Sequence, residues 1–80
     1  MASVTEIHTV ADGLVVSDPD ILGGKAVFRG TRLPVQSLFD YLADGLSLDY
    51  FLETFPSVTR EHAASVIRYG LRRIEVELAA

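Results

Sequence analysis

The hydrophobic pattern changes its period at Pro34, and this change constrains the fold more than any other feature of the chain. Before Pro34, the short runs LVV and AVF are followed by turn-forming residues, which predicts strands at about 14–16 and 26–33. After Pro34, apolar residues recur at i, i+3, i+4 and i+7, which is typical of one face of an amphipathic helix. We therefore expect a mainly α fold with a small N-terminal β element.

Two helices are predicted directly after this change. The first covers about 35–44, because Pro34 suits a helix start and Gly45 suits a left-handed C-terminal cap. The second covers about 48–55, with Ser47 as its N-cap. Their predicted core faces are Val35, Leu38, Phe39 and Leu42 in the first helix, and Leu48, Phe51, Leu52 and Phe55 in the second.

A third, longer helix is predicted over 60–78, with Thr59 as its N-cap. At 100° per residue, one stripe of this helix is apolar and is expected in the core, with Gly70 giving room for another backbone to approach. This stripe comprises Ala63, Val66, Ile67, Gly70 and Ile74. The opposite, outward face comprises Glu61, Ala64, Ser65, Arg68 and Arg72.

The 80 residues are expected to form a loose N-terminal arm at 1–12 and a single domain at 13–80. A domain of this size buries only ~60% of the surface of its unfolded chain, so its core is small. Leu71, Ile74 and Leu78 lie beyond the reach of a three-helix core of this length. We therefore expect a homodimer.

Several function classes are excluded by the residues present. There is no cysteine, and His8 and His62 have no second ligand at helical spacing, so neither a metal nor another cofactor is expected. The GGK triplet is followed by Ala26 where a phosphate-binding loop needs Ser or Thr. We expect no enzyme activity and no small-molecule substrate. No run of apolar residues is long enough for a membrane span and no export signal is visible, so a cytoplasmic location is expected.

The order of the three helices predicts a helix-turn-helix domain of the homeodomain-like or winged-helix-like kind. In such a domain the third helix enters the major groove of DNA, where small residues permit close approach and arginines contact bases or phosphates. The predicted DNA-binding residues are Arg60, Ala64, Ser65, Arg68 and Arg72. The alternative is a three-helix bundle whose arginines are only solvated.

The stretch GGKAVFRGTR carries a second group of cations, Lys25, Arg29 and Arg32. Its glycines are expected at positive φ, and Gly30 in particular is expected to form a turn between two extended segments. The three cations are then left at the surface. The sequence leaves three alternatives for what these cations contact: DNA phosphates, the carboxylates of a partner, or water.

Residues 18–70, DPDILGGKAVFRGTRLPVQSLFDYLADGLSLDYFLETFPSVTREHAASVIRYG, resemble the bacterial family catalogued as domain of unknown function 433. The matching segments are GGK, GTRLPV, GLS and FPSVT, all at the separations of the family pattern. Within it, the motif positions are Gly23, Gly24, Lys25, Gly30, Thr31, Arg32 and Pro34. Ala26 replaces the proline common in the family, and Tyr50 replaces a carboxylate. Tyr50 is expected either at an interface or as a cover for Phe51.

The resemblance implies a small antitoxin of the VapB type with a homeodomain-like helix-turn-helix, encoded beside a PIN-like ribonuclease toxin. The implied function is to neutralise that toxin and to bind operator DNA. The net charge is −4, and residues 34–58 contain four carboxylates and no basic residue. Both features agree with a basic protein partner. Carboxylates that only keep the helices soluble are the alternative. Two alternatives exist for the function of the whole chain: a DNA-binding regulator without a toxin, and an interaction module that does not bind DNA.

Overall fold

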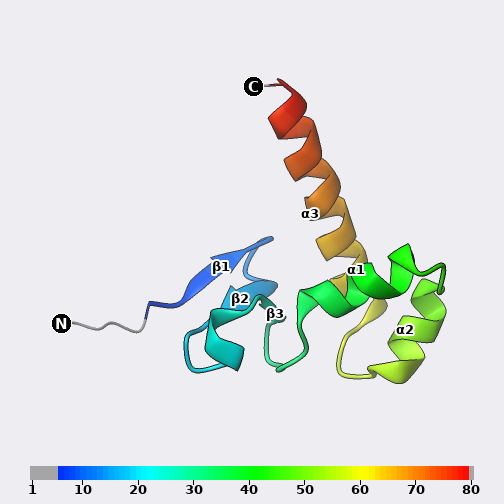
Figure 1. Cartoon of the computed structure of the whole chain (residues 1–80), viewed down its shortest axis with the longest axis horizontal. Helices are drawn as coiled ribbons and strands as arrows, with labels where there is room; N and C mark the ends of the chain where they lie inside the picture. The colour runs from blue at the N-terminus through cyan, green and yellow to red at the C-terminus, as the bar shows by residue number, and fades with distance from the viewer. Residues whose placement is uncertain (1–5, 80) are drawn as a thin grey trace.

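The computed structural model describes residues 6–79, in which a small sheet precedes three helices (Figure 1). The strands are β1 (His8–Val10), β2 (Val15–Ser17) and β3 (Val27–Phe28), with a 3-10 turn at Leu22–Gly24 before β3. The helices are α1 (Val35–Ala43), α2 (Leu48–Thr54) and α3 (Arg60–Ala79). The predicted mainly α fold is confirmed, and each helix end lies within one residue of its predicted position. Among the described helices, none has the length and apolarity needed to cross a membrane.

The three strands form an antiparallel sheet in the order β1, β2, β3. The chain turns between β1 and β2 through Ala11, Asp12 and Gly13, all of which have positive φ. The loose arm predicted at 1–12 is therefore wrong for His8–Val10, and residues 1–5 of it lie outside the described residues. The segment shows only weak alternation of its own, and its hydrogen bonding to β2 is what makes it a strand.

The strand predicted over 26–33 is only two residues long, because the chain folds back in a tight turn after β3. Gly30 has a φ of 79°, as expected from the sequence. The Thr31 hydroxyl donates to the carbonyl oxygen of Phe28 at 2.8 Å and accepts from the Leu33 N–H at 3.0 Å. The GTR part of the family motif therefore closes the turn that leads into α1.

The helix ends follow the predicted capping chemistry. The Ser47 hydroxyl accepts a hydrogen bond from the Tyr50 N–H at 3.0 Å at the start of α2. The Thr59 hydroxyl accepts from the His62 N–H at 3.1 Å at the start of α3. Gly45, with a φ of 85°, follows the last turn of α1. These caps satisfy backbone groups that a helix end leaves unpaired, so they set where each helix begins or ends.

The core joins the sheet to the helices. Phe28 of β3, Leu38 of α1 and Phe51 of α2 have no exposed surface, and the rings of Phe28 and Phe51 lie 6.3 Å apart. The other buried residues of this cluster are Ala11, Val15, Val58, Ala63 and Val66. The sheet is therefore attached to the helical part through Phe28 of β3 together with Ala11 and Val15 of the hairpin.

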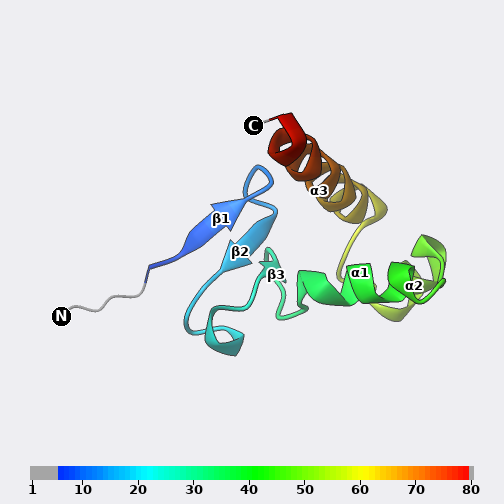
Figure 2. The same cartoon turned by 45° about the horizontal axis from the view of Figure 1, so that its top comes forward.

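The C-terminal half of α3 extends past the other elements, as Figures 1 and 2 both show. Residues 71–79 are all exposed. Ile74, predicted in the core, is 59% exposed, because no other described element reaches this far along α3. Gly70, predicted to admit another backbone, faces the ring of Phe39 instead: a Cβ added there would lie 3.7 Å from it. The core of the protein therefore ends at about Gly70.

Candidate functional site

The residues predicted to read DNA all lie on α3, and they differ in what surrounds them. Arg60, in the first turn, is exposed and forms an ion pair with Asp49 of α2. Both side chains are largely exposed, and such surface pairs contribute only about 0–1 kcal/mol. The pair therefore holds Arg60 weakly, and its guanidinium can exchange Asp49 for another anion at little cost.

Ala64 and Ser65 are half-buried, although the helical wheel places them on the outward face. Ser65 lines a hollow of about 340 Å³ together with Leu14, which precedes β2. The β1–β2 hairpin thus lies beside the first two turns of α3, and less of the predicted DNA-binding face is exposed to solvent there. A helical wheel of α3 alone contains no information about this neighbouring sheet.

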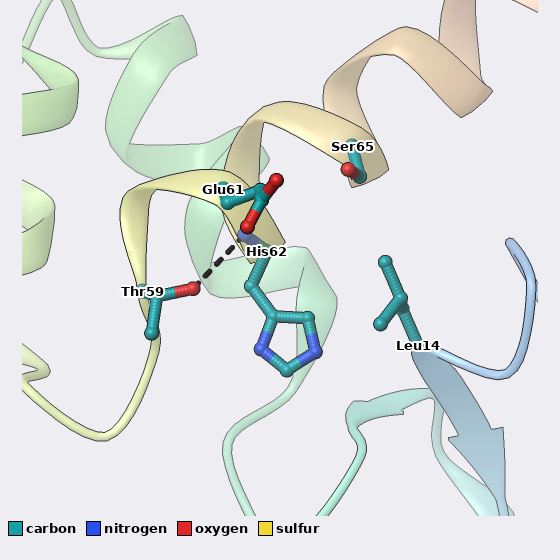
Figure 3. A pocket seen from close by; sticks show the side chains of 5 residues that line it. All are labelled: Leu14, Thr59, Glu61, His62 and Ser65. Atoms are coloured by element: carbon teal, nitrogen blue, oxygen red, sulfur yellow. Dashed lines mark hydrogen bonds between the residues drawn. The ribbon is translucent and has the colours of Figure 1, made fainter.

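His62 forms the inner side of the same hollow. Figure 3 shows its imidazole below the first turn of α3, with Leu14 of the hairpin across the hollow. Its ring lies 6.4 Å from the ring of Phe28, and its Nε2 is buried without a hydrogen-bond partner in the described part of the chain. This position of His62 was not predicted from the sequence, in which its place next to Ala63 of the core stripe is the one available signal.

Arg68 and Arg72 are exposed, one turn apart on α3. The guanidinium carbon of Arg72 lies 5.8 Å from the ring centre of Tyr69, a cation–π contact. No ion pair joins either arginine to a carboxylate within residues 6–79. These two side chains are therefore the cations of the predicted set that are best placed for an external anion.

Lys25, Arg29 and Arg32 are also exposed, and Arg29 contacts the β1–β2 hairpin. The main-chain N–H of Arg29 donates to the carbonyl oxygen of Leu14 at 2.8 Å. Its guanidinium lies over Gly13, where an added Cβ would be 3.5 Å from Nη1. Arg29, which directly follows β3, therefore lies beside Gly13 and Leu14 of the β1–β2 hairpin, and Leu14 lines the hollow.

α1, α2 and the turn after α1 carry four carboxylates and no base. These residues, Asp40, Asp44, Asp49 and Glu53, are all exposed. Tyr50 is 51% exposed and stacks on Tyr41 at 5.9 Å between ring centres. Tyr41 in turn contacts Phe51 edge-on, so Tyr50 covers the outer side of this aromatic cluster.

The described residues contain no group of three His, Cys, Asp or Glu side chains that are placed to hold a metal ion. The hollow at His62 is lined by Leu14, Thr59, Glu61, His62 and Ser65. The Thr59 hydroxyl is occupied by the cap of α3. The candidate functional site of the described residues is thus the exposed charged surface of the helices.

These features define a small, mainly helical protein with a sheet docked on its helices and exposed arginines on its last helix. The model of the family described as "Protein of unknown function (DUF433)" matches residues 15–70, and the chain belongs to this family. The match begins at β2 and ends at Gly70, where the core ends. The resemblance found in the sequence is confirmed at the level of the family.

A relative named "Uncharacterized protein y4eO", from Sinorhizobium fredii (strain NBRC 101917 / NGR234), is 48% identical over 48 residues. The matched part is 60% of this chain and 22% of that protein, so the chain spans less than a quarter of this curated relative. No solved structure matches the chain.

Proposed function

We propose that this chain is the antitoxin of a type II toxin–antitoxin pair, which binds operator DNA through α3 and neutralises a PIN-like ribonuclease. The observation that carries the proposal is the uneven distribution of exposed charge. α1, α2 and their turn carry four exposed carboxylates and no base, while α3 carries four arginines against the three carboxylates Glu61, Glu75 and Glu77. A DNA-binding surface requires cations, and a surface that covers a basic nuclease requires anions. The motif resemblance to small antitoxins supports the same function, which requires no catalysis by this chain.

The DNA-binding part of the proposal uses the order α1, α2, α3 with short connections. In helix-turn-helix proteins the helix after the turn enters the major groove. Arg68 and Arg72 are exposed on this helix, and Ala64 and Ser65 one turn before them are small residues that permit close approach of a base edge. Arg29, beside the hairpin, is a further exposed cation, and the proposal assigns it a phosphate contact like those of side chains that flank a recognition helix in other DNA-binding proteins.

The Arg72→Ala variant is expected to lose about 5- to 100-fold in affinity for the DNA upstream of the protein's own gene. Fluorescence anisotropy with labelled duplexes measures this, and the slope of log affinity against log salt should fall in magnitude by about 1 if Arg72 contacts a phosphate. Arg73→Ala is the matched control, because Arg73 is also exposed but points about 100° further around α3. If the upstream DNA binds no better than a scrambled duplex, the DNA-binding part is wrong.

The antitoxin part predicts that the product of the adjacent gene is toxic alone and is retained by this protein on co-expression. Affinity capture and a growth assay measure both. Replacing Asp40, Asp44 and Glu53 by their amides should weaken capture, because these exposed carboxylates have no ion pair among residues 6–79. Arg72→Ala should leave capture unchanged. A neighbour that is neither toxic nor retained would refute the antitoxin part and leave the DNA-binding part standing.

An interaction module that does not bind DNA is the second candidate. The observation in its favour is the hairpin beside α3, since Leu14 lines the same hollow as Ser65, which is only half-exposed. A recognition helix needs its first turns free to enter the groove. The DNA-binding experiment above distinguishes the two, since an interaction module would show neither a sequence preference nor an effect of Arg72→Ala.

A further inference from the structure

The projecting half of α3 carries an apolar stripe that nothing in residues 6–79 covers. Leu71, Ile74 and Leu78 are 55%, 59% and 83% exposed. Together with the half-buried Ile67 they are spaced by four, three and four residues, which is the spacing of the a and d positions of a coiled coil. In that frame Ile67 and Ile74 are d positions, and Leu71 and Leu78 are a positions. Such a stripe on a helix that projects from its domain is suited to pack against another helix.

We infer that α3 pairs with the α3 of a second copy of this chain, in antiparallel orientation, and that this helix pair makes the protein a dimer. Antiparallel pairing places Ile67 opposite Leu78 of the second copy, and Leu71 opposite Ile74 of the second copy. All four layers are then apolar. The overlap covers residues 67–78, about 18 Å at 1.5 Å per residue, and it leaves the two compact parts at opposite ends.

The charges beside the stripe select the antiparallel orientation. Arg68 and Glu75 each follow a d residue, so both occupy e positions, and neither has an ion pair among the described residues. In an antiparallel coiled coil, e positions face e positions of the other helix, so Arg68 faces Glu75 of the second copy, and the two-fold axis makes this contact twice. In a parallel pair, e positions face g positions, and Glu75 would face Gly70, which has no charge. The sequence is therefore self-complementary only when the helices are antiparallel.

Further apolar surface lies at the base of the stripe. The ring of Phe39 packs on the Gly70 position of α3 and remains 41% exposed. In the antiparallel pair, the C-terminal end of the second α3 lies along this part of the helix. Phe39 thus widens the contact where the four-layer stripe joins the compact part.

The orientation is tested by mixing two charge-reversed variants, Arg68→Glu and Glu75→Arg, and measuring mass by sedimentation equilibrium. Each variant alone places like charges opposite each other twice, so its dimer should dissociate about 10-fold more readily than the wild type. An equimolar mixture should restore wild-type dimerisation, because each copy then supplies the charge that the other lacks. If mixing restores nothing, or if neither variant is weakened, the antiparallel pairing is wrong.

The helix pair itself is tested by Leu71→Asp, which should sediment at the monomer mass of 8.7 kDa at concentrations where the wild type is a dimer. Val76→Asp is the matched control: Val76 is 56% exposed, nearly as much as Leu71, but it occupies an f position on the opposite side of α3. It should remain dimeric, and circular dichroism should show both variants folded. The inference would be overturned by a wild-type protein that is still monomeric at about 100 μM, or by a dimer that persists in the Leu71→Asp variant. The measurement uses no DNA, so it is independent of the proposed function of Arg68.

Discussion

Replacing Phe28 by alanine is expected to lower the free energy of unfolding by about 3–5 kcal/mol, more than any other truncation to alanine in the sheet. Phe28 has no exposed surface, and it is the side chain through which β3 contacts both Phe51 and His62 of the helical part. A small domain has only about 5–15 kcal/mol in total. The thermal midpoint, measured by circular dichroism, should therefore fall by about 15 °C or more.

Phe39→Ala provides the control for this experiment. The same atoms are removed, but Phe39 is 41% exposed, and its ring lies against Gly70 on the surface of α3. We expect a loss of roughly 1 kcal/mol, since less apolar area is returned to water. Equal losses at the two positions would mean that the sheet does not depend on Phe28 for its attachment to the helices.

Val66→Asp is expected to destabilise the protein by about 3–5 kcal/mol, because it places an unpaired charge in the core. Val66 lies on α3 and is 3% exposed, and it belongs to the cluster that joins the sheet to the helices. Urea denaturation followed by circular dichroism measures the loss. A loss of this size should lower the urea midpoint by about 1 M or more, since the free energy of unfolding falls by about 1–3 kcal/mol per M of urea.

Val76→Asp is the matched variant ten residues further along the same helix. Its side chain is 56% exposed, so the charge stays in water, and only a few tenths of a kcal/mol are expected from an acidic group near a helix C-terminus. The contrast between the two positions locates the end of the core. If Val76→Asp were as destabilising as Val66→Asp, the C-terminal half of α3 would have to be packed against the rest of the chain.

Successive segments of α3 differ in what surrounds them and in the side chains that they expose. The first two turns lie against the core, the hairpin and the hollow at His62. Arg68 and Arg72 follow at the middle, and the apolar stripe at 71–78 lies beyond the core. One helix therefore offers a packed segment, a cationic segment and an unpaired apolar segment in that order. This arrangement allows a dimer to form without covering Arg72.

Local signals in the sequence determined the helices of this protein. Ser47 and Thr59 accept backbone hydrogen bonds within three residues, and Gly30 and Gly45 adopt positive φ, so each of these features depends on neighbours in the chain. The spacing of apolar residues likewise located the core faces of α1 and α2, of which Leu38 and Phe51 are fully buried. Capping, turn formation and amphipathic spacing act over a few residues, and they are therefore readable without the fold.

Long-range contacts decided what the sequence analysis missed. His8–Val10 became a strand only through pairing with β2, and Ser65 became half-buried only because the hairpin stands beside α3. Ile74 has the same helical phase as the core residues Ala63 and Gly70, yet it is exposed because the other elements end before they reach it. A periodicity states which residues share a face of a helix. Which part of that face is covered depends on the length and placement of the elements around it, and only the tertiary structure contains that information.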